Sequence, residues 1–265
     1  MTAPVFLAPP DVLATARPGL TVWTEGEEAH HALRVQRVKA GEEAILVDGR
    51  GRRVFGKAAV PDGSPFFFID VTLVVDEPNP AAGVVLVQGL AKGGRDEMAL
   101  EAAVGLGVET VIPWQAERAV TRWTPGKAEK HRKRWEAIAR AEVKVGRRSW
   151  TPEILSVHST AQLVDSMTKG GLLGARNVIV LDETATVPFT QVAGEFLATF
   201  AAEDVERKGL AIVVGPEGGI TPEEVQALES AGARVARLWD AVLRSSIAGP
   251  AALAALATLR ERTSF

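Results

Sequence analysis

Two stretches in the C-terminal half of the chain carry residues whose types and spacing suit ligand binding. In the first, the apolar run LAIVV at 210–214 ends in the turn Gly215–Gly219, which reads GPEGG. Glycine lacks a Cβ, so it permits positive φ and lets a ligand approach the backbone closely, while Pro216 stiffens the turn. Thr221 and Glu224 have the spacing of a capping box, which fixes where a helix begins. The pattern predicts a rigid ligand-binding loop, with a plain strand-to-helix connection as the alternative.

The second stretch, at 238–249, reads LWDAVLRSSIAG and again joins a strand to a helix. Ser245 and Ser246 are both suitable N-cap residues for that helix. Arg244 directly precedes them, and a guanidinium at such a turn can hold a carboxylate or a phosphate. An ordinary surface cation is the other interpretation of this arginine. Together the two stretches favour a ligand site made from loops.

A third segment imitates a phosphate-binding loop without its chemistry. Gly51, Gly56 and Lys57 have the G-x-x-x-x-G-K spacing of that loop. Such a loop needs a Ser or Thr after the lysine to bind magnesium, and a helix must follow. Ala58 has no hydroxyl and its neighbours favour a strand, which excludes this interpretation.

Basic side chains gather in two parts of the chain, although the formal net charge is -3. Residues 30–41 read HHALRVQRVKAG, where Leu33, Val35 and Val38 are expected to face a core and the basic residues to face solvent. Residues 115–150 hold eleven Lys or Arg and four Glu. Clustered positive charge suits contact with nucleic-acid phosphates. A solvated basic face is the alternative for 30–41.

Length and composition exclude several classes of protein. A chain of 265 residues that is 46% hydrophobic and 24% charged can fill one large or two modest globular domains. The lack of Cys excludes disulfides, thiolate metal sites and a cysteine nucleophile, and the four His are too scattered for a metal cluster. Residues 1–12 lack the pattern of a signal peptide, and no apolar run reaches about 20 residues, so we expect a soluble, cytoplasmic protein without a signal peptide or a membrane segment.

The pattern of predicted secondary structure changes at Glu77–Pro80, where two prolines disfavour regular structure. Before this point, short β-favouring runs predict a small barrel with strands at 44–48, 53–60 and 66–75. After it, strands alternate with helices, which predicts a mostly parallel sheet covered on both faces. The expected strands are 84–90, 108–113, 177–182, 210–214 and 234–238. The expected helices are 96–106, 127–145, 190–200, 222–231 and one that ends near residue 262.

Five stretches, in this order, resemble one protein family over nearly the whole chain. They are HHALRVQRVKAG at 30–41, KGGRDEMALEAAVGLGVETVIPWQAERAV at 92–120, RRSWTPEI at 147–154, VVGPEGGITPEE at 213–224 and VLRSS at 242–246. The family is the SPOUT-class RNA methyltransferases, specifically the bacterial enzymes that methylate N-3 of a uridine in small-subunit (16S) ribosomal RNA. The resemblance implies a PUA-like or OB-like RNA-binding β-barrel at 1–76. It also implies an α/β SPOUT domain at 81–265, with a parallel sheet and a deep trefoil knot.

The resemblance implies a cofactor and its site as well. Three loops would enclose S-adenosylmethionine inside the knot, with backbone amides and carbonyls reading its adenine. The residues that correspond to this site are Leu181, Asp182, Glu183, Gly215, Pro216, Glu217, Gly218, Gly219, Leu238, Trp239, Leu243, Arg244 and Ser245. No metal is implied.

The implied partner is small-subunit ribosomal RNA, alone or in the 30S particle, and a homodimer would admit the target base between its subunits. The residues expected to contact RNA are His31, Arg34, Arg37, Lys39, Lys92, Arg118, Arg147 and Arg148. The imide N–H of uridine is weakly acidic and must lose its proton before the nitrogen attacks a methyl group. Arg118 or Arg244 would stabilise the developing anion, and Glu217 would orient groups or help the proton leave.

Four positions depart from the family pattern. Trp239 stands where Gly is usual, and a bulky indole there would narrow the cofactor pocket. Ser246 and Ile247 replace a Glu and a Thr, and Val145 stands where a Gln is expected. Two alternatives follow: a SPOUT methyltransferase that acts on another base or on a ribose, and a non-catalytic RNA-binding or ribosome-assembly protein that kept the fold.

Overall fold

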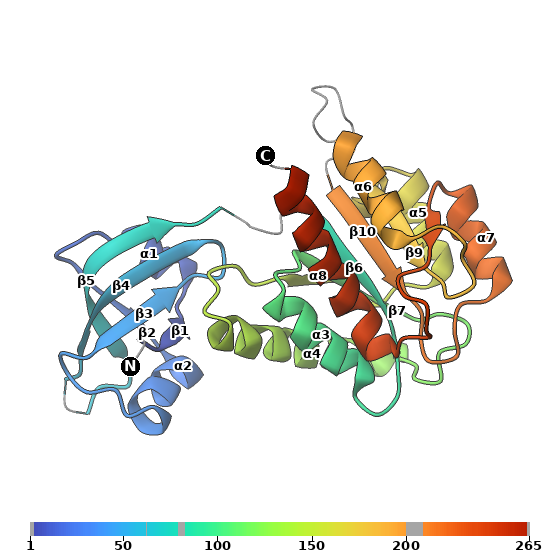
Figure 1. The fold of residues 1–265 in the computed structure, drawn as a ribbon. Helices are drawn as coiled ribbons and strands as arrows, with labels where there is room; N and C mark the ends of the chain where they lie inside the picture. The colour runs from blue at the N-terminus through green and yellow to red at the C-terminus, as the bar shows by residue number, and fades with distance from the viewer. Residues whose placement is uncertain (1–2, 62, 79–82, 200–208, 264–265) are drawn as a thin grey trace. The chain divides into compact units, whose positions relative to one another are not determined.

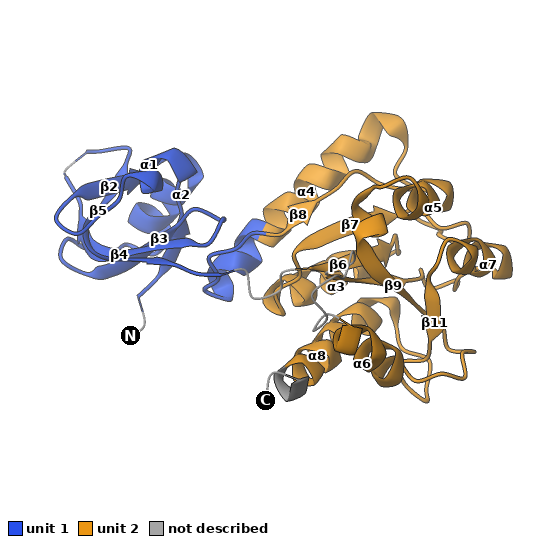
Figure 2. Ribbon diagram, turned by 90° about the horizontal axis from the view of Figure 1, so that it is seen from above, with its two compact units in different colours: residues 1–80, 140–151 blue, residues 81–139, 152–265 orange. Residues whose placement is uncertain are grey.

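The computed structural model describes residues 3–61, 63–78, 83–199 and 209–263. Contacts divide the chain into two compact units, which are coloured separately in Figure 2. The first unit comprises residues 1–80 and 140–151, and the second comprises residues 81–139 and 152–265. The chain therefore enters the second unit after Pro80, returns to the first at Arg140 and leaves it again after Thr151.

The first unit is built on a five-stranded sheet in the order β1-β3-β4-β5-β2 (Figure 1). Strands β1 and β3 are parallel and the other pairs are antiparallel. Its core includes the fully buried Phe6, Leu46 and Phe67. The bounds are β1 Val5–Leu7, α1 Pro10–Ala14, β2 Thr21–Thr24, α2 Gly26–His30, β3 Glu43–Val47, β4 Arg52–Ala59 and β5 Phe67–Asp76. The three expected strands correspond to β3, β4 and β5, and Lys57 of the rejected phosphate-loop pattern lies in β4.

The basic stretch at 30–41 is helical in its first half, because α2 continues into a π-helix at His31–Val35. Ala32 is buried and so is Val38, but Val35 is 62% exposed, so the prediction that Val35 faces the core is wrong. In this helical turn, Ala32 takes the inward position and Val35 points away. The basic residues of the stretch are exposed, as expected: Arg34, Arg37 and Lys39.

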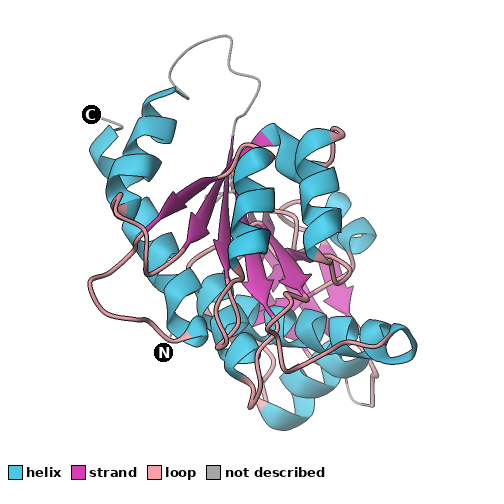
Figure 3. Ribbon diagram, turned by 90° about the vertical axis from the view of Figure 1, so that its right-hand side faces the viewer, coloured by secondary structure: helices cyan, strands magenta, loops and turns pink. Residues whose placement is uncertain are grey.

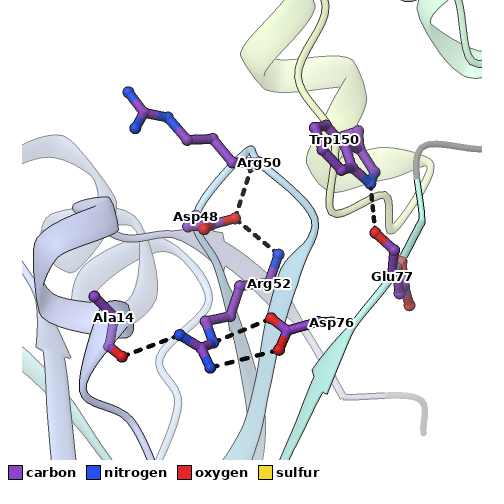
Figure 4. A network of polar contacts seen from close by, with 7 residues as sticks. All are labelled: Ala14, Asp48, Arg50, Arg52, Asp76, Glu77 and Trp150. Atoms are coloured by element: carbon purple, nitrogen blue, oxygen red, sulfur yellow. Dashed lines mark hydrogen bonds and ion pairs between the residues drawn. The ribbon is translucent and has the colours of Figure 1, made fainter. Parts of the chain in front are cut away.

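The end of helix α4 (Pro125–Val145) and the residues after it pack within the first unit. Lys144 Nζ lies 2.7 Å from Glu28 Oε1, which ties the last turn of α4 to α2. The indole N–H of Trp150 donates to the carbonyl of Glu77 at 2.9 Å (Figure 4). The domain bounds expected from the sequence put residues 140–151 in the C-terminal domain, whereas these contacts attach them to the first unit.

A second group of polar contacts fixes the turn between β3 and β4 (Figure 4). Asp48 Oδ1 accepts hydrogen bonds from the amides of Arg50 and Arg52 at 2.7 and 2.9 Å. The Arg52 guanidinium then lies 3.2 Å from Asp76 Oδ1 and donates to the carbonyl of Ala14 at 3.0 Å. These contacts join the β3–β4 turn, the end of β5 and α1 at one end of the barrel.

The second unit contains a six-stranded sheet in the order β11-β9-β10-β6-β7-β8, and every pair in it is parallel. All residues of β6, β7 and β10 are buried, as expected for central strands that are covered on both faces. The bounds are β6 Val84–Gly89, β7 Thr110–Trp114, β8 Glu153–Ile154, β9 Arg176–Leu181, β10 Gly209–Val214 and β11 Arg234–Ala236.

Helices cover both faces of this sheet. Figure 2 shows α3, α6 and α8 on one side and α5 and α7 on the other, and Figure 3 shows the same layers from another direction. Helix α8 packs against α3 and α6, while α5 packs against α7. The bounds are α3 Arg95–Gly105, α5 Thr160–Thr168, a 3-10 helix at Leu172–Ala175, α6 Phe189–Thr199, α7 Pro222–Ser230 and α8 Ser245–Thr263.

The strands and helices expected for this half are present among the described residues. Strand β8, helix α5 and the 3-10 helix were not predicted, and position 200 of the expected helix 190–200 lies outside the described residues. Within those residues, no helix is both long and apolar enough to cross a membrane.

Candidate functional site

The second unit places three loops at one edge of its sheet. Strands β9, β10 and β11 are parallel, so their carboxyl ends at Leu181, Val214 and Ala236 lie at the same edge. Ligands of open parallel sheets bind outside the carboxyl ends of the strands. The loops that follow these strands wall a cavity of about 740 Å³, a size typical of small-molecule sites.

This cavity collects the residues for which a cofactor-binding role was expected. Its wall includes Leu181, Asp182, Glu183, Gly215, Pro216, Glu217, Gly218, Gly219, Leu238, Trp239, Leu243, Arg244 and Ser245. The three residues expected to take part in the chemistry, Arg118, Glu217 and Arg244, also line it. The structure therefore brings both sets together, and their roles stay predictions.

The glycine turn after β10 is fixed by close backbone packing. A Cβ on Gly89, at the end of β6, would lie 2.5 Å from the nitrogen of the buried Pro216, so only glycine fits there. Gly219 has a φ of 75°, which favours glycine. Glu217 Oε1 accepts a hydrogen bond from the amide of Lys92 at 3.0 Å. The turn is thus held by β6 and by the loop that follows β6.

Arg118 reaches the cavity from the loop after β7. Its Nη1 lies 3.5 Å from the carbonyl oxygen of Gly218, and its guanidinium is exposed to solvent. A Cβ on Gly218 would lie 2.9 Å from the carbonyl oxygen of Arg118, so the two backbones are in close contact. The amide of Glu117 donates to the buried Glu224 carboxylate at 2.9 Å. Arg118 is therefore placed by its backbone, while its side chain stays free to meet a ligand.

The loop after β11 is more exposed. Trp239 is 66% exposed, so most of its indole faces solvent at the rim of the cavity and does not fill it. Helix α8 begins at Ser245, and Arg244 stands at the preceding position, where its carbonyl accepts the amide of Ile247 at 2.8 Å. The expected serine cap is thus replaced by Arg244. The Ser245 hydroxyl is buried and has no hydrogen-bond partner among the described residues.

The loop after β9 adds acidic groups to the wall. Asp182 Oδ1 accepts hydrogen bonds from the amide and the hydroxyl of Thr184 at 2.7 and 2.6 Å, which fixes the turn. Glu183 is exposed beside it. The same cavity is lined by four arginines: Arg95, Arg118, Arg237 and Arg244. A wall with both signs of charge suits a ligand that itself carries cationic and anionic groups.

Asp96 anchors the loop that leads from β6 to α3. The residue is 5% exposed, and its carboxylate accepts hydrogen bonds from the amides of Ala91 at 3.2 Å and Glu97 at 2.9 Å. Burial raises the pKa of the Asp96 carboxyl above its ordinary value, and the two amides oppose that shift. This carboxyl therefore supports the loop whose Lys92 amide holds Glu217.

The residues expected to contact RNA belong to both units. His31, Arg34, Arg37, Lys39, Arg147 and Arg148 are in the first unit, and Lys92 and Arg118 are in the second. Arg147 is exposed and has a φ of 51°, and its carbonyl accepts from Arg53 Nη2 at 2.5 Å. Arg148 is half-buried, and that burial lowers the pKa of its guanidinium. Arg118 is the member of this group that lines the cavity.

Part of the positive charge at 115–150 is matched by glutamates. Arg132 Nη2 lies 2.8 Å from Glu129 and Arg132 Nη1 lies 2.5 Å from Glu136, both within α4. Arg134 Nε lies 2.6 Å from Glu97 on α3. The net positive charge that this segment offers to a partner is therefore smaller than its number of Lys and Arg suggests.

Sequence reasoning missed other residues of the wall. They are Arg95, Thr184, Val214, Ile220, Pro222, Val225, Gln226, Glu229, Arg237, Ala241, Val242 and Ala248. Arg95 could have been found, because it follows the predicted strand 84–90 of a parallel sheet within a few residues. Arg237 lies inside the predicted strand 234–238, whereas β11 ends at Ala236 and leaves Arg237 in the loop. The α7 residues carry no comparable signal. In the described part of the chain, no group of three or more His, Asp or Glu is placed to hold a metal ion.

Known sequences show which proteins this chain is similar to. A family model described as an RNA methyltransferase domain matches residues 77–257, and one described as an RNA methyltransferase PUA domain matches residues 24–63. The ribosomal RNA small subunit methyltransferase E of Mycobacterium tuberculosis is 35% identical over 245 residues, which cover 92% of this chain and 88% of that protein. The protein of the same name from Bacillus subtilis is 30% identical over 235 residues, 87% of each chain.

Solved structures show which fold this chain shares. The ribosomal RNA small subunit methyltransferase E of Neisseria gonorrhoeae, bound to S-adenosyl methionine, has a TM-score of 0.79 and 24% identity, and covers 97% of this chain and 98% of its own. A Legionella pneumophila methyltransferase in complex with the same cofactor has a TM-score of 0.80 and 21% identity, with 97% and 98% coverage. These likenesses confirm the expected fold class, a PUA-like barrel with a SPOUT α/β domain built on a parallel sheet. The chain belongs to the ribosomal RNA small subunit methyltransferase E family of RNA methyltransferases.

Proposed function

We propose that the protein transfers a methyl group from S-adenosylmethionine to N-3 of a uridine in small-subunit ribosomal RNA. The observation that carries this proposal is the cavity of about 740 Å³, whose wall combines the three loops with two exposed arginines, Arg118 from the loop after β7 and Arg244 from the loop after β11. The relatives from Mycobacterium tuberculosis and Bacillus subtilis are named for methylation of small-subunit ribosomal RNA, which supports the same substrate class here.

The cavity wall fits this cofactor in size and in chemistry. The glycine turn at 215–219 offers backbone groups to an adenine, and the unpaired, buried hydroxyl of Ser245 offers one more hydrogen bond. Acidic groups near Asp182 and the arginines suit the ammonium and carboxylate ends of the methionine part. When bound, S-adenosylmethionine supplies an electrophilic methyl group on a sulfonium centre. The Neisseria and Legionella proteins, solved with this cofactor, support the assignment.

Methylation of uridine at N-3 requires the protein to stabilise a nucleobase anion. The uridine imide must lose its N-3 proton before that nitrogen acts as a nucleophile, and the negative charge then spreads to the ring oxygens. Arg118 and Arg244 present guanidinium groups where they stabilise this charge. Glu217, held by the Lys92 amide at 3.0 Å, orients groups at the reacting centre or helps the proton leave. Confinement of base and methyl donor in one cavity adds the benefit of proximity.

RNA binding by this chain rests on its exposed basic residues. Arg34, Arg37 and Lys39 on the barrel and Arg118 at the cavity would displace counterions from the phosphates. We therefore expect affinity for small-subunit RNA to fall steeply as salt increases. Filter binding at a series of salt concentrations measures this slope, and a flat dependence would contradict docking through these residues.

A homodimer belongs to the same proposal, with the target base entering between the subunits. Several large apolar side chains are exposed on the second unit: Met98, Val120, Val242 and Ile247. Exposed apolar surface often marks a contact between proteins. Sedimentation equilibrium should give the mass of a dimer, and a monomer at all concentrations would contradict the proposal. Ribosomal RNA as the substrate implies action in the cytoplasm.

Methyl transfer to 30S particles from a strain that lacks the protein tests the proposed function. Mass spectrometry of the digested RNA should find 3-methyluridine at one position. Arg118→Ala and Arg244→Ala should each lower kcat by about 100-fold, because each removes positive charge where the anion develops. Arg234→Ala is the matched control, since Arg234 pairs with Glu195 outside the cavity. Unchanged turnover in both cavity variants would contradict this mechanism.

Two other outcomes would favour the alternative functions. A methyl group on another base or on a ribose would keep the enzyme class and change the substrate. If calorimetry detects no binding at millimolar S-adenosylmethionine, a non-catalytic RNA-binding protein becomes the better interpretation.

A further inference from the structure

Glu224 makes more hydrogen bonds than its place in a capping box requires. The box itself uses Glu224 Oε2, which accepts the amide of Thr221 at 3.2 Å, while the Thr221 hydroxyl accepts the amide of Glu224. The other carboxylate oxygen, Oε1, accepts the amide of Glu117 at 2.9 Å and the hydroxyl of Thr160 at 2.6 Å. The Thr160 oxygen in turn accepts the indole N–H of Trp114 at 3.2 Å. The carboxylate thus joins the start of α7 to the loop after β7 and to the start of α5.

Another capping box, at the start of α5, shows that this arrangement is not needed to begin a helix. At the start of α5, Gln162 Oε1 accepts the amide of Ser159 at 2.8 Å, and Ser159 accepts the amide of Gln162 at 3.3 Å. These bonds are solvent-exposed and purely local. Glu224, in contrast, is 6% exposed. Burial of a carboxylate is unfavourable unless hydrogen bonds compensate, so the additional bonds to Glu117 and Thr160 offset a cost that the exposed box does not carry.

The bond to Glu117 determines where the next residue lies. Arg118 follows Glu117 directly, and the Arg118 backbone rests on Gly218 so closely that a Cβ on Gly218 would come within 2.9 Å of it. The Arg118 side chain has a long contact of 3.5 Å to the Gly218 carbonyl, which gives little positional restraint. The guanidinium therefore depends on its backbone for its place at the cavity, and Glu224 holds that backbone.

We propose that Glu224 is a positioning residue, which holds the Arg118 loop against the glycine turn so that the guanidinium stays at the cavity. This inference rests on the proposed function, because it assigns Glu224 a role through Arg118. Glu224 itself is not part of the cavity wall, so the role assigned to it is indirect and acts through Arg118. A displacement of a charged group by about 1 Å can lower a rate by up to 100-fold, so the support is expected to matter.

A double-mutant cycle in the methyl-transfer assay tests this role, with Arg118→Ala, Glu224→Ala and the double variant. Glu224→Ala should lower kcat on 30S particles by about tenfold, while the dissociation constant for S-adenosylmethionine changes less than about twofold. In the Arg118→Ala background, the same substitution should lower kcat by less than about twofold, because the group it positions is absent. An equal loss in both backgrounds would overturn the positioning role.

Two further variants separate positioning from general damage. Gln162→Ala removes the reciprocal bond of the exposed capping box and should leave kcat unchanged. Thr160→Val keeps the α7 box and the Glu117 bond but removes one hydrogen bond to Glu224, so it should reproduce a smaller loss of kcat with the same dependence on Arg118. If Glu224→Ala does not fold, Thr160→Val decides, and a loss that persists in the Arg118→Ala background overturns the inference.

The outcome for Arg118→Ala alone separates the proposed role of Arg118 from the positioning role of Glu224. Wild-type turnover in that variant would contradict the proposed role of Arg118 and, with it, the inference. A loss in Arg118→Ala together with an additive loss in Glu224→Ala would contradict only the positioning role.

Discussion

The two loops that carry the clearest sequence patterns are built in opposite ways. The turn at 215–219 is held from several sides: Gly89 packs under it, Lys92 binds its glutamate and Arg118 covers its Gly218. The loop at 238–244 faces solvent with Trp239 and Val242, and regular secondary structure resumes only where α8 begins. One loop is fixed by other parts of the chain, and the other presents its side chains outward.

This difference suggests that the two loops have different binding roles in the same cavity. A loop fixed by backbone contacts can offer amides and carbonyls in constant positions, which suits a cofactor that is the same in every reaction cycle. A loop with exposed aromatic and aliphatic side chains suits contact with another macromolecule. Substitutions in the first loop should therefore affect folding, and those in the second should spare it.

The largest effect is expected for Gly89→Ala. Its new Cβ would lie 2.5 Å from the nitrogen of Pro216 and 2.7 Å from the carbonyl carbon of Gly215, and neither backbone atom can move without displacing the turn. The free energy of unfolding should fall by about 3 kcal/mol, as for an overpacked core. Urea unfolding measures it.

The control for this substitution is Gly194→Ala, in helix α6, where a Cβ meets nothing within 4 Å. It should raise stability by about 0.8 kcal/mol, because alanine is a better helix former than glycine. A loss in Gly89→Ala no larger than the change in the control would show that the turn is not fixed by packing.

A smaller, ligand-specific effect is expected for Ser245→Ala. The Ser245 hydroxyl has no partner among the described residues, so its removal should leave the free energy of unfolding within about 0.5 kcal/mol. If the hydroxyl binds the cofactor, calorimetry should show affinity for S-adenosylmethionine weakened about fivefold, which corresponds to one hydrogen bond. Ser246→Ala, a buried serine outside the cavity wall, should change neither quantity.

Trp239→Gly, which restores the usual family residue, should change cofactor affinity less than about twofold. The indole is 66% exposed, so its loss removes little of what encloses the cavity. Calorimetry with S-adenosylmethionine measures this affinity. A tenfold change in either direction would mean that the indole covers the bound cofactor, and the two loops would then not divide their tasks.

The smallest effect is expected for Asp96. Its carboxylate supports the loop between β6 and α3, and the Lys92 amide of that loop binds Glu217 in the turn at 215–219. Burial raises the pKa of this carboxyl in the folded protein above the ordinary 3.8, so folding favours its protonated form. Its contribution to stability is complete below the ordinary pKa and is lost as pH rises through the raised value. Wild type should therefore lose stability relative to Asp96→Asn over that interval, as followed by urea unfolding across pH. A constant difference between the two proteins would contradict the shift.

The sequence was most informative where local chemistry decides the structure. Pro216, Thr221 and Glu224 specify the turn and the start of α7 within a few residues, and the strand pattern specifies the edge at which the loops meet. It failed where an irregular helix or distant parts of the chain decide. The inward turn of Ala32 in place of Val35 depends on a π-helix, and the second set of bonds at Glu224 comes from residues more than sixty positions away.

The outward direction of Trp239 was also beyond local reasoning. A Trp in a cofactor loop is bulky whichever way it points, and only the neighbouring loops determine that most of its indole lies in solvent. For the same reason, the number of basic residues at 115–150 overstated the positive charge that can act on a partner. The fold brings Arg134 next to Glu97, which lies outside this segment and pairs with it.

The return of the chain to the first unit at 140–151 bears on how this protein can be taken apart. A fragment that stops near Pro80 would lack Trp150, whose indole N–H satisfies the carbonyl of Glu77, and Lys144, which neutralises Glu28. A fragment that starts there would carry those residues without their partners. A single crossover near residue 80 would therefore separate the barrel from residues that complete it. Exchange of the barrel between related proteins would need residues 140–151 to be exchanged with it.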